Sequence, residues 1–289
     1  ADGTLLWQFP AFSSSQSTPL AIDLDGDGRM EVLHRHQARS HTGQLLWSLP
    51  GSGTTTYSLF APTRLQDGTL GLVASEQNSS GARLSLLRAD GTAVWQIAGG
   101  VVTRAGTPLV VDVDADGQQE IFLAAQGTLF DADGSVRWRV GATTWAARAF
   151  RAAVSGDLDR DGEVDILGFS DNGLNLLSGE GGVALSVDAA WDDADDYHVV
   201  PVVVDPYGLD DAVVIVGGIT GLRVIDPVVG RWRSETSVFH QQPWARDRIT
   251  SSLTVPAAVS GALPARMMEM SERAVAATPA QLLSDLHLA

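Results

Sequence analysis

The chain has 289 residues, of which 35 are acidic and 19 are basic, so its formal net charge is −16. This balance argues against nucleic-acid binding, which needs a basic surface, and against docking on anionic membranes. The absence of cysteine excludes disulfides, thiolate metal sites and cysteine nucleophiles. No apolar run approaches the ~20 residues of a membrane span. The chain begins at Ala1 without a signal peptide, and we therefore expect a processed chain or a piece of a longer protein.

A short unit recurs along the chain, consisting of a turn with glycine, a few apolar residues and a tryptophan. The units read DGTLLW, TGQLLW, DGTAVW, DGSVRW and PVVGRW, and they end at Trp7, Trp47, Trp95, Trp138 and Trp232, with Leu185 at the equivalent place in GEGGVAL. The spacing between consecutive markers is 40–48 residues. This regularity predicts a repeat protein, in which the tryptophans are primarily residues that pack one repeat against the next.

A second unit precedes most of these markers and contains an apolar run, an Asp-rich loop and another apolar run. It occupies residues 18–33, 107–123 and 152–169, and degenerate copies lie around 58–73 and 199–217. Short runs rich in Val, Ile and Leu are typical of buried strands. With about four strands in each repeat of about 45 residues, the pattern predicts an all-β fold, a β-propeller.

Five full repeats span about residues 8–235, and the strand around Trp7 belongs to a further blade. A ring of six blades is therefore expected, or of seven if other segments supply strands. We divide the chain into a propeller, residues 1–235, and a C-terminal extension, residues 236–289. In the extension, 265–277 and 280–288 are predicted to form short helices that dock on the propeller, close it or contact a partner.

The three Asp-rich loops match position by position. Position 6 is glycine in each, and we expect metal ligands at positions 1, 3, 5, 7 (through the backbone carbonyl) and 9. These are Asp23, Asp25, Asp27, Arg29 and Glu31; Asp112, Asp114, Asp116, Gln118 and Glu120; and Asp157, Asp159, Asp161, Glu163 and Asp165. Alternate side chains of a loop that curls around one ion point inward, so these carboxylates meet at its centre.

Oxygen ligands with this much negative charge favour Ca²⁺ over Zn²⁺, Cu²⁺ or Mg²⁺. An EF-hand is excluded because position 12 is His34, Leu123 or Gly168 rather than a carboxylate. The alternative is a set of acidic turns without metal, since Asp-Gly favours turns by itself. We predict about three calcium ions with a structural role, so that folding is coupled to metal binding.

DLDGDGRMEVL, DVDADGQQEIFL and GDLDRDGEVDILGF resemble FG-GAP/VCBS repeats, the calcium-loop blades of integrin-α-like propellers. The resemblance covers about residues 15–235, although the Phe-Gly and Gly-Ala-Pro signatures are not intact. It implies a scaffold exposed to millimolar calcium outside the cytoplasm. The second repeat has Thr63, Leu65, Asp67 and Gly71 at the ligand positions, and the fifth has Asp205, Tyr207 and Leu209; both are predicted to bind no metal. The DGxxxW strands also resemble, weakly, repeats of quinoprotein propellers.

For two other groups of residues we prefer a structural interpretation over a functional site. The histidines His34, His36 and His41 fit a polar strand face better than a metal or acid–base site. The acidic run Asp188, Asp192, Asp193, Asp195 and Asp196, beside Trp191 and Tyr197, fits a solvated loop better than a cation or sugar site. Trp145, Arg148 and Arg151 could contact an anionic or sugar ligand, and Asn78-Ser79-Ser80 matches a glycosylation acceptor.

The sequence therefore predicts a calcium-stabilised, extracytoplasmic β-propeller that acts as a protein interaction, adhesion or assembly module with a protein or glycan partner. One alternative is a carbohydrate-binding lectin. Another is part of a secreted enzyme, similar to a polysaccharide lyase or a quinoprotein. Fold alone does not choose among these alternatives. We assign no catalytic residue and favour a protein that is not an enzyme.

Overall fold

The computed structural model describes residues 3, 5–8, 18–49, 55–140, 153–156, 158, 163–170, 173–181, 183–188, 201–204, 213–218 and 221–225. The predicted helices of the C-terminal extension lie outside these residues. Within them, the secondary structure consists of β-strands. No helix in this part of the chain has the length and hydropathy that a membrane crossing requires.

The strands form antiparallel sheets in which consecutive strands are neighbours. The first sheet contains β1 (Leu20–Ile22), β2 (Glu31–His34), β3 (Gln37–Arg39) and β4 (Leu45–Ser48). The second contains β5 (Thr55–Arg64), β6 (Leu70–Asn78), β7 (Gly81–Arg88) and β8 (Ala93–Ala98). The third contains β9 (Pro108–Val111), β10 (Glu120–Leu123), β11 (Thr128–Phe130) and β12 (Val136–Arg139).

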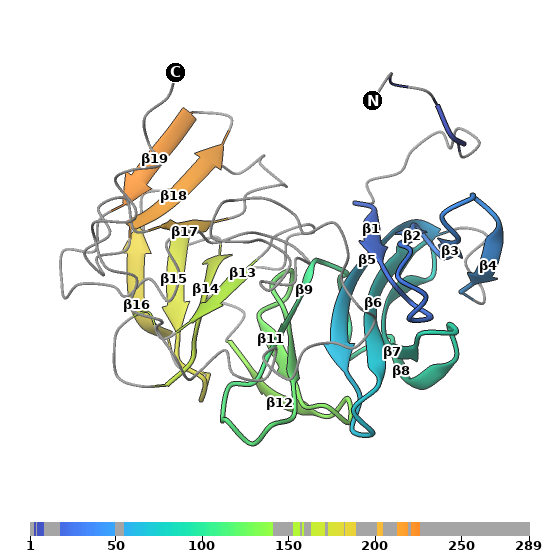
Figure 1. Cartoon of the computed structure of the whole chain (residues 1–289). Helices are drawn as coiled ribbons and strands as arrows, with labels where there is room; N and C mark the ends of the chain where they lie inside the picture. Colours follow the sequence, from blue (N-terminus) through green and yellow to red (C-terminus); the bar gives the residue numbers. More distant parts are fainter. Residues whose placement is uncertain are drawn as a thin grey trace, which may run out of the picture.

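Two further sheets follow. The fourth contains β13 (Ala153–Gly156), β14 (Asp165–Ser170), β15 (Gly173–Leu177) and β16 (Val183–Asp188), and the fifth contains β17 (Val202–Val204), β18 (Val213–Gly218) and β19 (Gly221–Ile225). The sheets follow one another side by side in chain order (Figure 1). The first strands of adjacent sheets are neighbours, since β9 lies beside both β5 and β13. This is the blade arrangement of a β-propeller, so the predicted fold class is confirmed.

The core lies between adjacent sheets, so a central strand is buried on both faces. All four residues of β10 are buried; Ile121 packs in a cluster with Leu84 of the second sheet, and Phe122 in a cluster with Ile166 of the fourth. A strand covered on both faces needs apolar side chains at consecutive positions. This explains the continuous apolar runs, such as EIFL, that replace the alternating pattern of a half-exposed strand.

The register of the outer pair of strands shifts in each four-stranded sheet. The irregularities lie at Ala38/Arg39, Leu86/Leu87 and Leu129/Phe130 in the first three sheets, and at two places between β15 and β16 in the fourth. Such bulges increase the local twist of the outer strand. Because the irregularity recurs between the third and fourth strands of each of these sheets, the repeats share the path of the backbone as well as the sequence pattern.

Strand direction places two kinds of connection at the same end of each sheet. The Asp-rich loops join the first strand to the second, and the glycine turns of the tryptophan markers join the third to the fourth. Because strand direction alternates, these two connections lie at one end and the connection between the second and third strands lies at the other. Side chains of the marker turn can therefore reach the Asp-rich loop of the same sheet.

Candidate metal centre

The first Asp-rich loop joins β1 to β2 and is organised by its own carboxylates. The two carboxylate oxygens of Asp23 accept hydrogen bonds from the backbone amides of Gly26 and Gly28, at 2.8 and 3.0 Å. Asp25 accepts from the amide of Asp27 at 3.1 Å. Gly26 and Gly28 have φ angles of 79° and 84°, in the left-handed region where side chains are disfavoured. The sequence thus curls here because aspartates cap the amides and glycines permit the turns.

The second Asp-rich loop, between β9 and β10, repeats this geometry. Asp112 accepts a hydrogen bond from the amide of Gly117 at 3.0 Å, and Asp116 accepts from the amide of Gln118 at 2.7 Å. Ala115 stands where the first loop has glycine and has a φ of 57°. The second oxygen of Asp112, Oδ1, is buried and lacks a hydrogen-bond partner within the described part of the chain. A buried carboxylate oxygen without a donor is suited to coordinate a cation.

The carboxylate at position 9 closes each loop in the same manner. One oxygen accepts a hydrogen bond from the backbone amide of position 2: Glu31 from Leu24 at 2.8 Å, Glu120 from Val113 at 3.0 Å, and Asp165 from Leu158 at 2.9 Å. The three acidic residues are only 3%, 1% and 2% exposed. Each loop is therefore tied to the first residue of the second strand by one oxygen of a buried carboxylate.

Ligand atoms converge in both fully described loops. Oxygens of Asp23, Asp25 and Asp27 lie within 4.8 Å of one another, as do those of Asp112, Asp114 and Glu120. Either cluster could hold a metal ion. In the third loop Asp157, Asp159 and Asp161 lie outside the described residues, whereas Glu163 is exposed and Asp165 is buried. The loop of the fifth repeat, with Asp205, Tyr207 and Leu209, also lies outside them.

The electrostatics of both loops favour a cation. Burial raises the pKa of Glu31, and the charges of Asp25, Asp23 and Asp27 raise it further. Burial also raises the pKa of Glu120, to about 7, against a normal value of 4.5. The pKa of Asp112 is raised by burial and by the charges of its two neighbours in the loop. Carboxylates gathered in this way are more stable when neutralised, either by protons or by a bound cation.

One arginine distinguishes the second loop from the first. Arg137 of β12 forms ion pairs with Asp114 at 2.7 Å and with Asp131 at 2.5 Å, and lies 3.9 Å from Glu120. In the first sheet the equivalent marker position is Leu46, which is 47% exposed. The sequence interpretation did not identify Arg137. The signal available in the sequence was the charge of Arg137 itself, since the residues at the same position of the three preceding markers are Leu6, Leu46 and Val94.

The degenerate second repeat differs from these loops. A tight turn joins β5 to β6, with a hydrogen bond of 2.8 Å from the amide of Gly68 to the carbonyl of Leu65. Thr63 is buried, and Asp67 is exposed and pairs with Arg88 at 3.1 Å. A single carboxylate stands at the former ligand positions, which fits the prediction that this repeat holds no metal.

The remaining candidates divide by location. His41 contacts Arg29 at 3.1 Å, and burial together with the charge of Arg35 lowers the pKa of His36, so that imidazole remains neutral. Asn78-Ser79-Ser80 lies at the turn between β6 and β7. Asp188 ends β16. Outside the described residues lie Asp192, Asp193, Asp195 and Asp196 with Trp191 and Tyr197, and also Trp145, Arg148, Arg151 and Trp232.

Comparison with known proteins identifies relatives by fold. No protein-family model matches the chain, and no curated protein matches it. A crystal structure of the V. cholerae biofilm matrix protein Bap1 aligns with a TM-score of 0.63 and 14% identity, over 85% of this chain and 69% of that one. The exotype rhamnogalacturonan lyase YesX aligns with a TM-score of 0.52 and 18% sequence identity, and rhamnogalacturonan lyase YesW with a TM-score of 0.51 and 16% identity.

These alignments cover 75% and 76% of this chain, but only 46% and 47% of the two lyases. The chain thus spans less than half the length of either enzyme. At such identities the likeness extends to the fold, and it agrees with the propeller-like blades described above.

Proposed function

We propose that this chain is a calcium-stabilised β-propeller of the FG-GAP/VCBS type that serves outside the cytoplasm as a binding or assembly module. The observation that carries the proposal is the common geometry of the Asp-rich loops. In each of them a buried carboxylate at position 9 accepts a hydrogen bond from the amide at position 2. In the two fully described loops, oxygens of three carboxylates lie within 4.8 Å of one another: those of Asp23, Asp25 and Asp27 in the first, and those of Asp112, Asp114 and Glu120 in the second.

Calcium suits these loops for reasons of charge and flexibility. Ca²⁺ accepts six to eight oxygen ligands in variable geometry, whereas Mg²⁺ requires a compact octahedron and retains several waters. The ligands would be Asp23, Asp25, Asp27, Glu31 and the carbonyl of Arg29, and their equivalents in the second and third loops. The resemblance of the loops to FG-GAP/VCBS repeats, which implies exposure to millimolar calcium, supports an extracytoplasmic location.

The likeness to structures of a biofilm matrix protein and of two polysaccharide lyases is compatible with work on an extracellular surface. A protein interaction or adhesion role, with a protein or glycan partner, remains our first proposal for the propeller. A catalytic role would require a cluster of acidic, basic and nucleophilic side chains in one cleft. Glycan binding is the second candidate, and a specific pocket favours it.

The test is a set of thermal melts of the full chain with excess calcium, with EDTA, and with EDTA plus excess Mg²⁺. We expect a large fall in melting temperature with EDTA and recovery with calcium alone, because an ion that binds the folded state stabilises it by mass action. Measurement of bound metal at equilibrium with millimolar calcium, by dialysis, should give about three calcium ions for each chain. An unchanged melting temperature in EDTA would contradict the proposal and leave the loops as acidic turns.

A further inference from the structure

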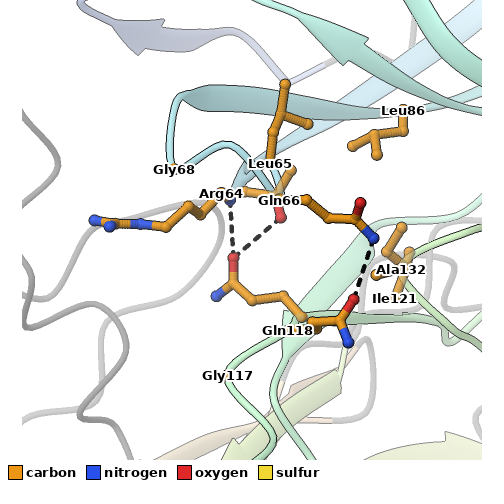
Figure 2. A pocket seen from close by; sticks show the side chains of 11 residues that line it. Arg64, Leu65, Gln66, Gly68, Leu86, Gly117, Gln118, Ile121 and Ala132 are labelled. Carbon is orange, nitrogen blue, oxygen red and sulfur yellow. Dashed lines mark hydrogen bonds between the residues drawn. The ribbon is translucent and has the colours of Figure 1, made fainter.

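A pocket of about 380 Å³ lies between the second and third sheets. One wall is the tight turn that joins β5 to β6, and the opposite wall is the Asp-rich loop before β10 (Figure 2). The pocket exists because the second repeat has a short turn where the other repeats carry a longer loop. Its volume falls within the range of ~300–1,000 Å³ that small-molecule sites occupy.

The lining of the pocket combines apolar side chains with carboxamides. Leu65, Leu86 and Ile121 belong to the buried core and form the floor of the pocket, and Gln66, Gln118 and Gln119 supply the polar part. Small-molecule sites commonly have this composition, in which apolar contact provides area and a few polar groups fix orientation. The pocket could not be predicted from the sequence, because its glutamines come from two different repeats.

Hydrogen bonds between the two sheets hold one of these carboxamides in place. The side-chain oxygen of Gln119 accepts from the hydroxyl of Thr63 at 3.0 Å and from the backbone amide of Arg64 at 2.9 Å. The amide nitrogen of Gln119 therefore has a fixed position, and it makes no hydrogen bond within the described part of the chain. Its two hydrogens are available to a ligand.

The other two glutamines form a pair across the pocket. The amide nitrogen of Gln66 donates to the side-chain oxygen of Gln118 at 3.3 Å (Figure 2). The amide nitrogen of Gln118 in turn donates to Asp116 at 3.1 Å. The carbonyl oxygen of Gln66 has no donor within the described residues and can accept one from a ligand. The pocket therefore offers a donor and an acceptor on facing walls.

This arrangement is specific to one junction between sheets. Gln119 is position 8 of its loop, and the equivalent residues are Met30 in the first loop and Val164 in the third. Neither residue carries the carboxamide with which Gln119 accepts hydrogen bonds from Thr63 and Arg64. The pocket is therefore an individual feature of the second and third sheets and not a consequence of the repeat.

We propose that this pocket binds a neutral pyranose unit of a glycan. Carboxamides match sugar hydroxyls because each hydroxyl both donates and accepts a hydrogen bond. The adjacent loop disfavours anionic sugars. Its four carboxylates outnumber the two charges of a calcium ion and the one charge of Arg137, so this wall stays negative when the ion is bound, while Arg64 places one positive charge on the opposite wall.

The calcium dependence of this site rests on the proposed function. Gln118 stands at position 7, where the backbone carbonyl is an expected calcium ligand, while its side chain lines the pocket. An ion in the loop would fix Gly117, Gln118 and Gln119, and thereby one wall of the pocket. Preorganisation of this kind lowers the entropic cost of binding.

The experiment is saturation-transfer NMR on the full chain in calcium, with D-galactose, D-mannose, L-rhamnose and N-acetyl-D-glucosamine as neutral probes and D-galacturonate as the charged probe. We expect at least one neutral sugar to bind, and Gln66→Ala and Gln119→Ala each to weaken its binding about fivefold to tenfold, the effect of one lost hydrogen bond. Gln44→Ala is the matched control, since Gln44 is an exposed glutamine of the first sheet.

Three results would overturn the proposal: no neutral sugar binds, galacturonate alone binds, or both pocket variants bind as the wild type does. Repetition in EDTA separates this proposal from the calcium proposal. Lost melting stability in EDTA without any sugar binding in calcium would refute the pocket and support the metal sites. Sugar binding that is sensitive to Gln66→Ala, in a chain whose stability ignores EDTA, would support the pocket and refute the metal sites.

Discussion

The indole nitrogen of Trp47 donates a hydrogen bond of 2.9 Å to the backbone carbonyl of Ala89, which joins the outer strand of the first sheet to a turn of the second. The same bond recurs from Trp7 to His41, from Trp95 to Ala132 and from Trp138 to Gly179. In every case the acceptor precedes the marker glycine by two residues. Each marker thus makes two contacts. Its tryptophan contacts the following sheet, and its glycine turn contacts the tryptophan of the preceding sheet.

The marker glycines are required because the tryptophan ring lies on them. A Cβ atom at Gly91 would lie 2.6 Å from Cδ2 of Trp47, and its φ is 81°. Gly68 has a φ of 79° but nothing within 4 Å of such an atom. We expect Gly68→Ala to lower the free energy of unfolding by about 1 kcal/mol through backbone strain alone. Gly91→Ala should cost a further ~1–3 kcal/mol, because the new methyl group displaces the ring.

Urea unfolding of the two variants in saturating calcium measures this difference. Gly68→Ala serves as the control, since it introduces the same methyl group at the same backbone angle without the tryptophan. Equal losses in the two variants would mean that the ring contact contributes nothing to stability.

Much of the fold could be predicted from the repeat itself. The spacing of the tryptophans and the apolar runs predicted four strands for each repeat, and the sheets confirm this through the fourth repeat. The role of Trp47 and its equivalents as packing residues between blades is also confirmed. The periodicity carries this information because each repeat makes the same contacts with its neighbours.

The parts that sequence interpretation missed depend on contacts between segments that no repeat relates. Arg137 reaches Asp114 because the marker turn and the Asp-rich loop lie at the same end of one sheet. Gln119 meets Thr63 and Arg64 because the second repeat has a short turn. The metal assignment for the carboxylates remains a prediction, since the geometry brings the ligands together without identifying the ion.

Replacement of Glu120 by glutamine should separate the structural and metal-binding roles of position 9. The amide oxygen of glutamine can still accept the hydrogen bond from Val113, while the buried charge disappears. In EDTA we expect Glu120→Gln to melt at or above the wild-type temperature, because the wild-type carboxylate is buried at 1% exposure among other carboxylates. In calcium, the variant should show a smaller calcium-induced rise in melting temperature.

Thermal melts of each protein in EDTA and in calcium provide the measurement. Glu163→Gln is the matched control, since Glu163 is exposed and is expected to contribute its carbonyl alone. If Glu120→Gln kept the full stabilisation by calcium, position 9 would not be a ligand.

The stability of the metal-free protein should fall as pH rises from about 4.5 to above 7. Burial raises the pKa of Glu120 to about 7 in the folded state, against its normal value of 4.5 in the unfolded chain, so the folded state binds the proton more tightly. The stabilising contribution of Glu120 is complete below pH 4.5 and is lost as pH rises through 7. The free energy of unfolding can fall by at most about 1.4 kcal/mol for each pH unit and each proton involved. Glu31 and Asp112, whose pKa values are also raised, act in the same direction.

Melts in EDTA between pH 4.5 and 8 measure this trend. Calcium should remove or reverse it, because the ion binds the deprotonated carboxylates. Asp67 does not interfere, since its hydrogen bonds to Thr69 and Arg88 lower its pKa to about 2 and its contribution is lost only below pH 3.8. His36, whose pKa is lowered by burial, opposes the trend because its contribution grows as pH rises, so the decisive comparison is between wild type and variant. Glu120→Gln should flatten the fall in stability, and identical pH profiles of the two proteins would contradict the raised pKa of Glu120.

Arg137→Leu should make the second loop behave like the first. Arg137 places a positive charge 2.7 Å from Asp114 and 3.9 Å from Glu120, whereas Leu46 stands at the equivalent position of the first sheet. The arginine therefore neutralises part of the loop in the absence of metal and competes with a cation for the same oxygens. We expect Arg137→Leu to be less stable than the wild type in EDTA, and its second loop to bind calcium about tenfold more tightly, or about 1.4 kcal/mol.

Calorimetric titration of the metal-free protein with calcium resolves this change, because a single class of sites should shift toward the affinity of the first loop. Arg88→Leu removes the same charge from an exposed pair with Asp67 and should leave calcium affinity nearly unchanged, since exposed ion pairs contribute little. Weaker calcium binding in Arg137→Leu would show that the arginine positions Asp114 for the ion. In that case the arginine would support the site, and the difference between the two loops would lie in how each holds its carboxylates in place.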